Sequence, residues 1–219
     1  MRRIEKLTGY LEKCTVFTDV ACDHGYCAEY MLKTGLCESA VISDISPQSL
    51  SKAEKLLSGY IKCGKCRSVC CDGLEKIEKN DGLVLIAGIG GEETVKILKN
   101  SYIPERFVFQ PMKNSSYLRD FLISKGCNLE KDDVFFDGKK YYFVIKGTSG
   151  GACRNYSVLE KAFGKDSLKN PEFIGYATEE LAKKRAIFKR KLSSESRKKV
   201  TQDVEFLERA IDETRRNIE

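Results

Sequence analysis

The 219-residue sequence lacks the features that mark a membrane or secreted protein. It contains no run of 18 or more apolar residues, and its N-terminus does not pass from charged to apolar to small residues. Neither a membrane span nor a secretory signal is therefore indicated, and we expect a cytoplasmic protein with no membrane partner. Apolar residues still make up 42% of the chain, which is enough for a buried core.

A metal-binding cysteine pattern is also missing, although there are ten cysteines. Cys63 and Cys66 form the one zinc-like pair, and the nearest further cysteines are the adjacent Cys70 and Cys71. A structural zinc site normally takes four ligands from two spaced pairs, so buried or idle thiols are the better interpretation and we expect no metal.

The sequence also lacks a large net charge: it has 38 lysines and arginines and 32 acidic residues, which gives a net charge of +6. The positive charge is concentrated between residues 181 and 199, where Glu195 is the one acid. This basic run favours a polyanionic partner, while a solvated helix face is an equally good interpretation.

The first 150 residues alternate between strand and helix patterns. Strands are predicted at 16–21, 40–45, 67–71, 82–87 and 106–110, with helices at 26–35, from Pro47, at 92–98 and at 117–125. A hairpin pattern follows, with segments 134–136 and 140–145 joined by Asp137-Gly138. We therefore expect a Rossmann-like α/β domain over residues 1–150, with a mostly parallel sheet and an antiparallel edge strand.

Residues 151–219 are predicted to form a second, helical unit after the linker candidate at 148–151. Apolar positions from Phe173 to Leu192 and from Val200 to Ile218 recur at helical spacing, with a break near Ser193–Ser196. The pattern predicts an antiparallel helical hairpin with a coiled-coil-like seam. The sequence leaves two roles open for this hairpin: it could bind RNA, or it could only pack against the rest of the protein.

The loop after the first strand lacks the Gly-x-Gly-x-x-Gly pattern of dinucleotide-binding proteins. Gly25 remains, but Ala21 and Asp23 occupy positions where glycine is common. Two carboxylates, Asp19 and Asp23, would repel a diphosphate, whereas they suit the sulfonium and ammonium of S-adenosylmethionine. The charge pattern favours that cofactor over NAD.

The next three strands each end in residues suited to an adenosine-containing ligand. Asp44 is placed to accept the ribose hydroxyls, and Asp72 to bond the adenine amino group. The glycines of segment 87–91 permit close contact with a ligand. Each of these features alone is weak evidence, but four of them at the ends of four successive predicted strands give stronger evidence for an adenosine-containing ligand.

These residues resemble the bacterial tRNA (adenine-22-N1)-methyltransferases. The resemblance lies in Asp19-Val-Ala-Cys-Asp-His-Gly-Tyr26, Cys71-Asp-Gly-Leu74, Ala87-Gly-Ile-Gly-Gly91, Gln110-Pro111 and Leu118-Arg119, and it extends to Phe163-Gly164 and the C-terminal hairpin. It implies methyl transfer from S-adenosylmethionine to N1 of adenosine 22 in the tRNA core, with tRNA as partner. The sequence does not give the oligomeric state, for which a monomer is the default.

The resemblance also implies a set of site residues. The cofactor set is Asp19, Cys22, Asp23, His24, Gly25, Tyr26, Asp44, Ile45, Asp72, Gly73, Ala87, Gly88, Ile89, Gly90 and Gly91; the catalytic candidates are Asp23, Gln110 and Pro111. The expected RNA-binding residues are Arg2, Arg3, Lys6, Lys183, Lys184, Arg185, Lys189 and Arg190.

The base-recognition residues depart from the family in one place. An asparagine commonly follows the Gln-Pro pair in relatives, whereas this chain has Met112, and Asn114 is the nearest amide that could replace it. His24, the one histidine, could be a general base, but adenine N1 is unprotonated at neutral pH and a role in shaping the cofactor loop is favoured. Asp23 is the candidate to stabilise charge developing on the base.

Two other functions remain open from the sequence. The same cofactor could serve a protein or small-molecule acceptor, which predicts no salt-dependent tRNA binding. The second alternative is a non-catalytic RNA-binding protein whose cofactor pocket has lost its function. Met112 is the one residue that favours this alternative.

Overall fold

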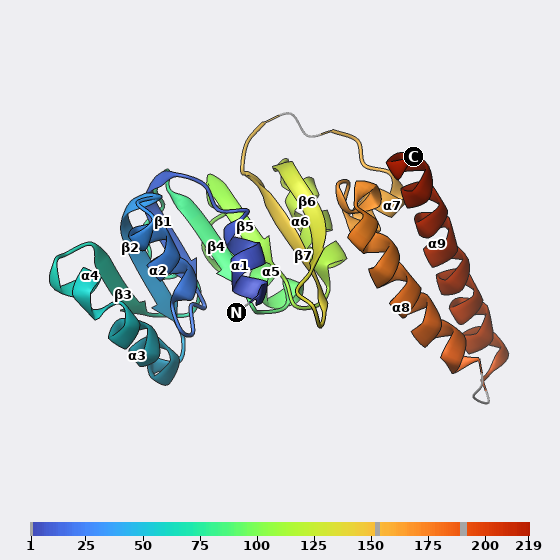
Figure 1. Cartoon of the computed structure of the whole chain (residues 1–219), viewed down its shortest axis with the longest axis horizontal. Coiled ribbons are helices and arrows are strands. Elements are labelled where there is room, and N and C mark those ends of the chain that lie inside the picture. Colours follow the sequence, from blue (N-terminus) through green and yellow to red (C-terminus); the bar gives the residue numbers. More distant parts are fainter. Residues whose placement is uncertain (1, 152–153, 189–191) are drawn as a thin grey trace.

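A seven-stranded sheet forms the centre of the molecule in the computed structural model, which describes residues 2–151, 154–188 and 192–219 (Figure 1). The strand order is β3-β2-β1-β4-β5-β7-β6. The strands are β1 (Cys14–Val20), β2 (Cys37–Asp44), β3 (Cys66–Cys70), β4 (Leu83–Ala87), β5 (Arg106–Gln110), β6 (Asn128–Phe136) and β7 (Tyr141–Thr148).

The first five strands are parallel, and β7 pairs antiparallel with both β5 and β6. The sequence prediction of a Rossmann-like, mostly parallel sheet with an antiparallel edge is thus confirmed. The antiparallel member is β7, one place in from the edge, because the β6–β7 hairpin inserts its second strand beside β5. The order reverses between β1 and β4, the place where ligands bind in open α/β sheets.

Helices cover both faces of the sheet (Figure 1). Apolar residues of α1 (Arg2–Thr8), α2 (Tyr26–Lys33) and α3 (Pro47–Leu56) share one core cluster with β1 and β2. The other cluster combines α5 (Gly91–Asn100) and α6 (Ser115–Ser124) with β4 and β5. Strand β4 is buried along most of its length, as its unbroken apolar sequence predicts.

The C-terminal segment folds as a helical hairpin beside β6 and β7 (Figure 1). It comprises α7 (Val158–Phe163), a 3₁₀ turn at Ser167–Lys169, α8 (Pro171–Ile187) and α9 (Ser194–Ile218). Helices α8 and α9 pack through Phe173, Ala177, Leu181, Leu207 and Ile211. The predicted hairpin is present, and Leu159 and Phe163 of α7 join its core.

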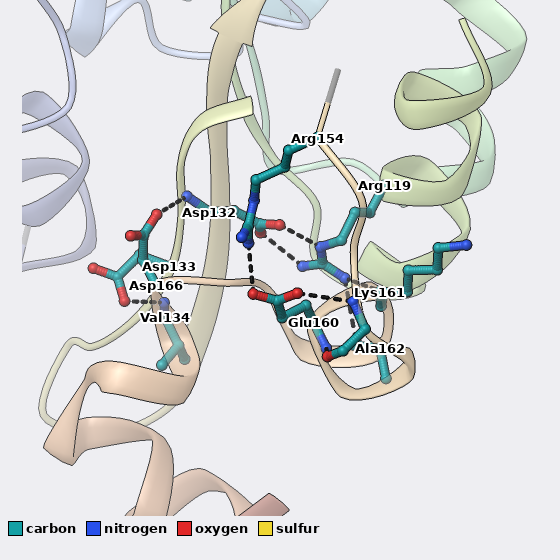
Figure 2. A network of polar contacts seen from close by, with 10 residues as sticks. Arg119, Asp132, Asp133, Val134, Arg154, Glu160, Lys161, Ala162 and Asp166 are labelled. Atoms are coloured by element: carbon teal, nitrogen blue, oxygen red, sulfur yellow. Dashed lines mark hydrogen bonds and ion pairs between the residues drawn. The ribbon is translucent and has the colours of Figure 1, made fainter. Parts of the chain in front are cut away.

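A buried polar network joins this hairpin to the sheet (Figure 2). The Arg119 guanidinium of α6 binds the Asp132 carboxylate of β6 and donates to the carbonyls of Lys161 and Ala162 in α7. Asp132 in turn donates its backbone N–H to Asp166, just before the 3₁₀ turn. The division at residue 150 stays a prediction, and the two predicted units share this network as well as apolar contacts with Val134 and Phe143.

Candidate active site

A pocket of about 240 Å³ lies at the carboxyl edge of the parallel strands. It is lined from the ends of β1, β2 and β3, from the loop after β4, and from α5. The lining residues are Val20, Ala21, Asp44, Ile45, Asp72, Gly73, Ile89, Glu93, Lys96 and Ile97. Five of the predicted cofactor residues therefore meet in one pocket: Asp44, Ile45, Asp72, Gly73 and Ile89.

The loop after β1 turns through left-handed backbone conformations. Ala21 and Asp23 have φ values of 56° and 44°, and Gly25 has φ 72° at the start of α2. A Cβ atom at Gly25 would lie 3.0 Å from the Ala53 side chain, so α2 and α3 approach closely at this glycine. Non-glycine residues rarely adopt such φ values, and strained residues often mark ligand-binding loops.

The Asp44 carboxylate ties this loop to the next one. Its Oδ2 accepts from the Asp23 backbone N–H at 3.1 Å, and its Oδ1 accepts from that of Ser46 at 2.9 Å. Ser46 caps α3 by accepting from Ser49 N–H, with Pro47 in the first turn. Each Asp44 oxygen keeps further acceptor capacity for a ligand in the pocket.

Asp19 is buried near the end of β1, next in sequence to the pocket residue Val20. Its Oδ2 accepts from Ala28 N–H at 3.3 Å, in the first turn of α2. Burial, together with the negative charge of Asp44, raises the pKa of Asp19 to about 7. A cation bound at this edge of the sheet would favour the ionised form of Asp19.

Among the other predicted residues of the first loop, Asp23, His24 and Tyr26 are exposed. The His24 ring stacks on the Tyr26 ring, with centroids 5.3 Å apart, and the His24 side chain and Tyr26 are 46% and 41% exposed. The Asp23 carboxylate binds Lys52 Nζ at 3.1 Å and is more than half exposed. Cys22 is half-buried, and burial beside Asp19 and Asp44 raises the pKa of its thiol far above the ordinary range. Within the described residues, no three His, Cys, Asp or Glu side chains are grouped to hold a metal ion.

The loop after β3 lies close to α5. Gly73 has φ 60°, and a Cβ atom there would lie 2.5 Å from Ile97 of α5. Its carbonyl accepts from Ser43 Oγ at 3.2 Å, which fixes the loop against β2. A side chain at position 73 would therefore narrow the pocket between Asp72 and Ile97.

The glycine loop after β4 is joined to the Gln-Pro loop after β5 by three backbone hydrogen bonds. Gly88 donates to the Gln110 carbonyl at 3.2 Å, Met112 to that of Ile89 at 2.8 Å, and Gly91 to that of Lys113 at 2.9 Å. A Cβ atom at Gly91 would lie 2.2 Å from the Asn114 carbonyl oxygen. The close approach of these loops therefore requires glycine at position 91.

Gln110 is held by Arg3 of α1 rather than left free toward the surface. Arg3 Nη1 donates to Gln110 Oε1 at 3.3 Å and to Met112 Sδ at 3.3 Å, and Gln110 Nε2 donates to the Pro111 carbonyl at 3.1 Å. The Gln110 side chain is 1% exposed. The roles of Gln110 and Pro111 in base contact stay predictions, and this geometry gives Gln110 a part in shaping the loop. Asn114, the alternative amide, donates to Glu92 at 2.9 Å.

Four of the five predicted RNA-binding side chains that the structure describes have acidic partners. Lys183 binds Glu180, Lys184 binds Asp203 and Arg185 binds Glu208, each at 2.6 Å, and Lys6 lies 3.5 Å from Glu172. Lys183 and Arg185 remain 66% and 60% exposed. Exposed ion pairs are weak, so phosphate can compete for these cations. Lys189, Arg190 and the side chain of Arg2 lie outside the described residues.

Sequence reasoning missed the α5 wall of the pocket and the position of Arg3. Glu93, Lys96 and Ile97 lie three and four residues apart on one face of α5, directly after the glycine loop. That spacing after a strand end was the available signal. The contact of Arg3 with Gln110 spans 107 positions, and no local pattern indicates it.

Comparison with known proteins agrees with this architecture. A protein of Mycoplasma pneumoniae provisionally described as a tRNA methyltransferase is 28% identical over 164 residues, which cover 73% of this chain and 76% of the relative. Among solved structures, TrmK of M. capricolum with S-adenosyl-homocysteine has a TM-score of 0.88 and 21% identity over 97% of each chain. The m1A22 tRNA methyltransferase TrmK of B. subtilis has a TM-score of 0.80 and 21% identity over 99% of this chain and 97% of that one.

The solved structures establish the shared fold, including the helical hairpin, since they cover almost the whole of this chain. The family model for the Methyltransferase domain matches residues 1–145, from α1 into β7. This match spans more than half of the sequence and contains the whole pocket, so the chain belongs to the Methyltransferase domain family.

Proposed function

We propose that this methyltransferase transfers a methyl group from S-adenosylmethionine to N1 of adenosine 22 in tRNA. The observation that carries the proposal is the acidic pocket at the carboxyl edge of the sheet, directly beside the joined Gly88 and Gln110 loops. A methyl donor in the pocket and an acceptor base at these loops would be neighbours. Methyl transfer by displacement depends mainly on such positioning.

The residues of the pocket fit S-adenosylmethionine. Ile45, which is 66% exposed, and Ile97 of α5 both line the pocket, and two apolar side chains of this kind suit the faces of an adenine ring. Asp44 has acceptor capacity for the ribose hydroxyls, and Asp72 for the adenine amino group. The bound cofactor would supply an electrophilic methyl group on a positively charged sulfur, and the buried Asp19, next in sequence to the pocket residue Val20, would help to balance that charge.

No side chain is required to deprotonate the acceptor, because adenine N1 carries a free lone pair at neutral pH. This agrees with His24, which stacks on Tyr26 and lies in the outer part of the first loop. The product base is cationic, so a carboxylate near it would stabilise the developing charge. Asp23 keeps that candidate role, and to perform it the side chain would have to exchange Lys52 for the substrate.

Three observations support tRNA as the acceptor. The helical hairpin carries exposed cations on α8, and the solved proteins of this fold include the m1A22 tRNA methyltransferase of B. subtilis, which matches over the hairpin as well. The M. pneumoniae relative is also described as acting on tRNA. A folded RNA core buries its bases, so the enzyme has to extrude or loosen the target nucleotide.

The competing proposal is a protein or small-molecule acceptor. Filter binding of unmodified tRNA at increasing salt separates the two, because binding through phosphates weakens steeply with ionic strength. Salt-dependent tRNA binding together with label transfer from S-adenosylmethionine to that RNA would support the tRNA proposal. Label transfer to another acceptor with no tRNA binding would replace it.

A further inference from the structure

A second pocket, of about 280 Å³, lies between the Gln-Pro loop and the helical hairpin. One wall is the segment Pro111–Ser115, directly after Gln110. The opposite wall consists of Tyr141 and Phe143 of β7 with Tyr176 and Glu180 of α8. No residue lines both this pocket and the one proposed for the cofactor.

The wall on the side of the helical hairpin contains three packed aromatic rings, of which Phe143 is buried and Tyr141 and Tyr176 are half-buried. Phe143 and Tyr176 meet edge to face, with centroids 4.9 Å apart and an interplanar angle of 89°. The ring centroids of Tyr141 and Tyr176 are 6.0 Å apart, and a Cβ atom at Gly175 would lie 2.1 Å from the Tyr141 hydroxyl oxygen. The missing side chain at Gly175 thus leaves room for Tyr141. Aromatic surfaces of this kind stack planar rings.

The same wall carries polar groups that lack a full set of partners. The Tyr176 hydroxyl makes no hydrogen bond to another side chain or backbone group in the described part of the chain. Burial and the charge of Glu180 raise the pKa of Tyr176 to about 12, so it is a neutral phenol at physiological pH. Glu180 binds Lys183 through Oε1 and keeps Oε2 as an acceptor.

The opposite side of the pocket offers a cation. Lys113 is 63% exposed, and its Nζ lies 3.8 Å from Glu93 Oε1, a long and weak ion pair. An aromatic wall, a carboxylate acceptor and an exposed ammonium together match the ring, the amino edge and the phosphate of a nucleotide.

We propose that this pocket binds one unstacked base of the RNA, next in sequence to the methylated adenosine, with its exocyclic amino group donating to Glu180. The inference rests on the proposed function, since Pro111 would border the target base and also begins the wall of this pocket. Extrusion of the target breaks its stacking on the neighbouring bases. A pocket that begins at Pro111, beside the proposed position of the target base, can hold the neighbouring base and so keep the RNA open.

The test uses full-length protein, saturating S-adenosylmethionine, and tRNAs in which either neighbour of the target is replaced by an abasic nucleotide. With wild-type protein, one of the two abasic tRNAs should raise KM about tenfold, the effect of one lost stacking contact. Tyr176→Leu should raise KM similarly on intact tRNA, and the abasic change should then add little, because both remove the same interaction.

Glu180→Gln tests the polar contact without disturbing the aromatic core. It should raise KM for tRNA several-fold at unchanged kcat, whereas Glu179→Gln, the same change on an adjacent exposed residue of α8, should leave KM unchanged. Cofactor affinity should stay constant in all variants.

The inference is overturned if wild-type protein methylates both abasic tRNAs like intact tRNA, or if the Tyr176 and abasic effects multiply independently. In those cases the proposed function still stands. If wild-type protein does not methylate intact tRNA, the proposed function fails, and this inference fails with it.

Discussion

Arg119 and Asp132 form a fully buried, bidentate ion pair where the sheet meets the C-terminal helices (Figure 2). Arg119 Nε lies 2.5 Å from Asp132 Oδ2, and Nη2 lies 2.8 Å from Oδ1. The remaining Nη1 donates to the carbonyls of Lys161 and Ala162 at 2.9 and 3.1 Å. One guanidinium therefore connects α6, β6 and α7, and fixes the base of the helical hairpin.

Breaking this pair should destabilise the protein strongly. Arg119→Met leaves the Asp132 carboxylate buried without a partner, and we expect a loss of about 3–5 kcal/mol in the free energy of unfolding. Urea denaturation measures it. The double variant Arg119→Met/Asp132→Leu should recover part of that loss, because it removes the unpaired charge but leaves the α7 carbonyls unbonded. A loss below about 1 kcal/mol in the single variant would contradict this role.

Cofactor binding should depend on the protonation of Asp19. The raised pKa of about 7 means that the folded protein without cofactor retains a proton that the unfolded chain releases near pH 4. The contribution of Asp19 to folding stability is therefore full below about pH 4, falls as pH rises to about 7, and stays constant above. A bound cation favours the carboxylate, so affinity for S-adenosylmethionine should rise with pH up to about 7 and then level off.

The variant Asp19→Asn separates these effects. It should weaken cofactor binding about tenfold or more at pH 8, abolish the pH dependence, and raise the melting temperature of the cofactor-free protein at that pH. Calorimetric titration at several pH values measures the affinity. Asp120→Asn, an exposed position on α6, is the control and should change neither quantity. Equal pH dependence in Asp19→Asn and wild type would exclude Asp19 as the titrating group.

The junction of the Gly88 and Gln110 loops should not tolerate a side chain. At Gly91 a methyl group would collide with the Asn114 carbonyl and push apart the loops that border the proposed methyl-transfer site. We expect Gly91→Ala to cost about 1–3 kcal/mol in stability and to lower kcat more than tenfold. Gly59→Ala is the matched control, since nothing lies within 4 Å of a Cβ atom there, and it should be neutral or slightly stabilising. Full activity in Gly91→Ala would show that the close loop contact is dispensable.

The exposed cations of α8 should contribute to RNA binding by exchanging their acidic partners for phosphates. Replacing Lys183, Lys184 and Arg185 by glutamine should reduce the salt dependence of tRNA binding, by about 2 in the slope of log K against log salt. The same change at three exposed lysines of the β3 edge should leave the slope unchanged: Lys55 of α3, Lys62 in the segment after it, and Lys65 directly before β3. An equal decrease in both triple variants would indicate a response to net charge alone.

The order of the five strands in the first 110 residues follows from the sequence pattern, because the buried strands carry apolar runs. The β5 bounds 106–110 match the structure, and the others differ by a few residues. Strand β6 begins at Asn128, six residues before the predicted start. Its early part includes Glu130, Lys131 and Asp132. Glu130 is exposed and Lys131 half-buried, whereas the buried Asp132 is neutralised by Arg119, a residue distant from it in the sequence.

Other differences have similar physical causes. Helix α1 lacks a strong local signal, and its place depends on Leu7 in the core and on the contact of Arg3 with Gln110. The single predicted helix after Pro47 divides into α3 and α4 (Ser58–Lys62) at Leu57, a buried residue with φ −93° and ψ 11°. Helix α7 depends on the capping box of Ser157 and Glu160, which the apolar pattern does not reveal.

The pocket could be anticipated where a strand end carries an acid or a glycine. Asp44, Asp72 and Gly73 line it because parallel strands place their carboxyl ends at one edge of the sheet. The direction of the side chains in the first loop could not be predicted from the sequence, because it depends on the left-handed conformations of Ala21 and Asp23, with Asp23 paired to Lys52. Whether Asp23 turns back toward a bound base is a prediction about the complex.

Nucleoside analysis of unmodified tRNA, incubated with this protein and S-adenosylmethionine labelled in its methyl group, tests the proposed reaction most directly. The expected product is labelled 1-methyladenosine from a tRNA that carries A22, with the label lost when A22 alone is changed to another base. Label at a different nucleoside, or label that persists after A22 is changed, would contradict the assignment of substrate and site.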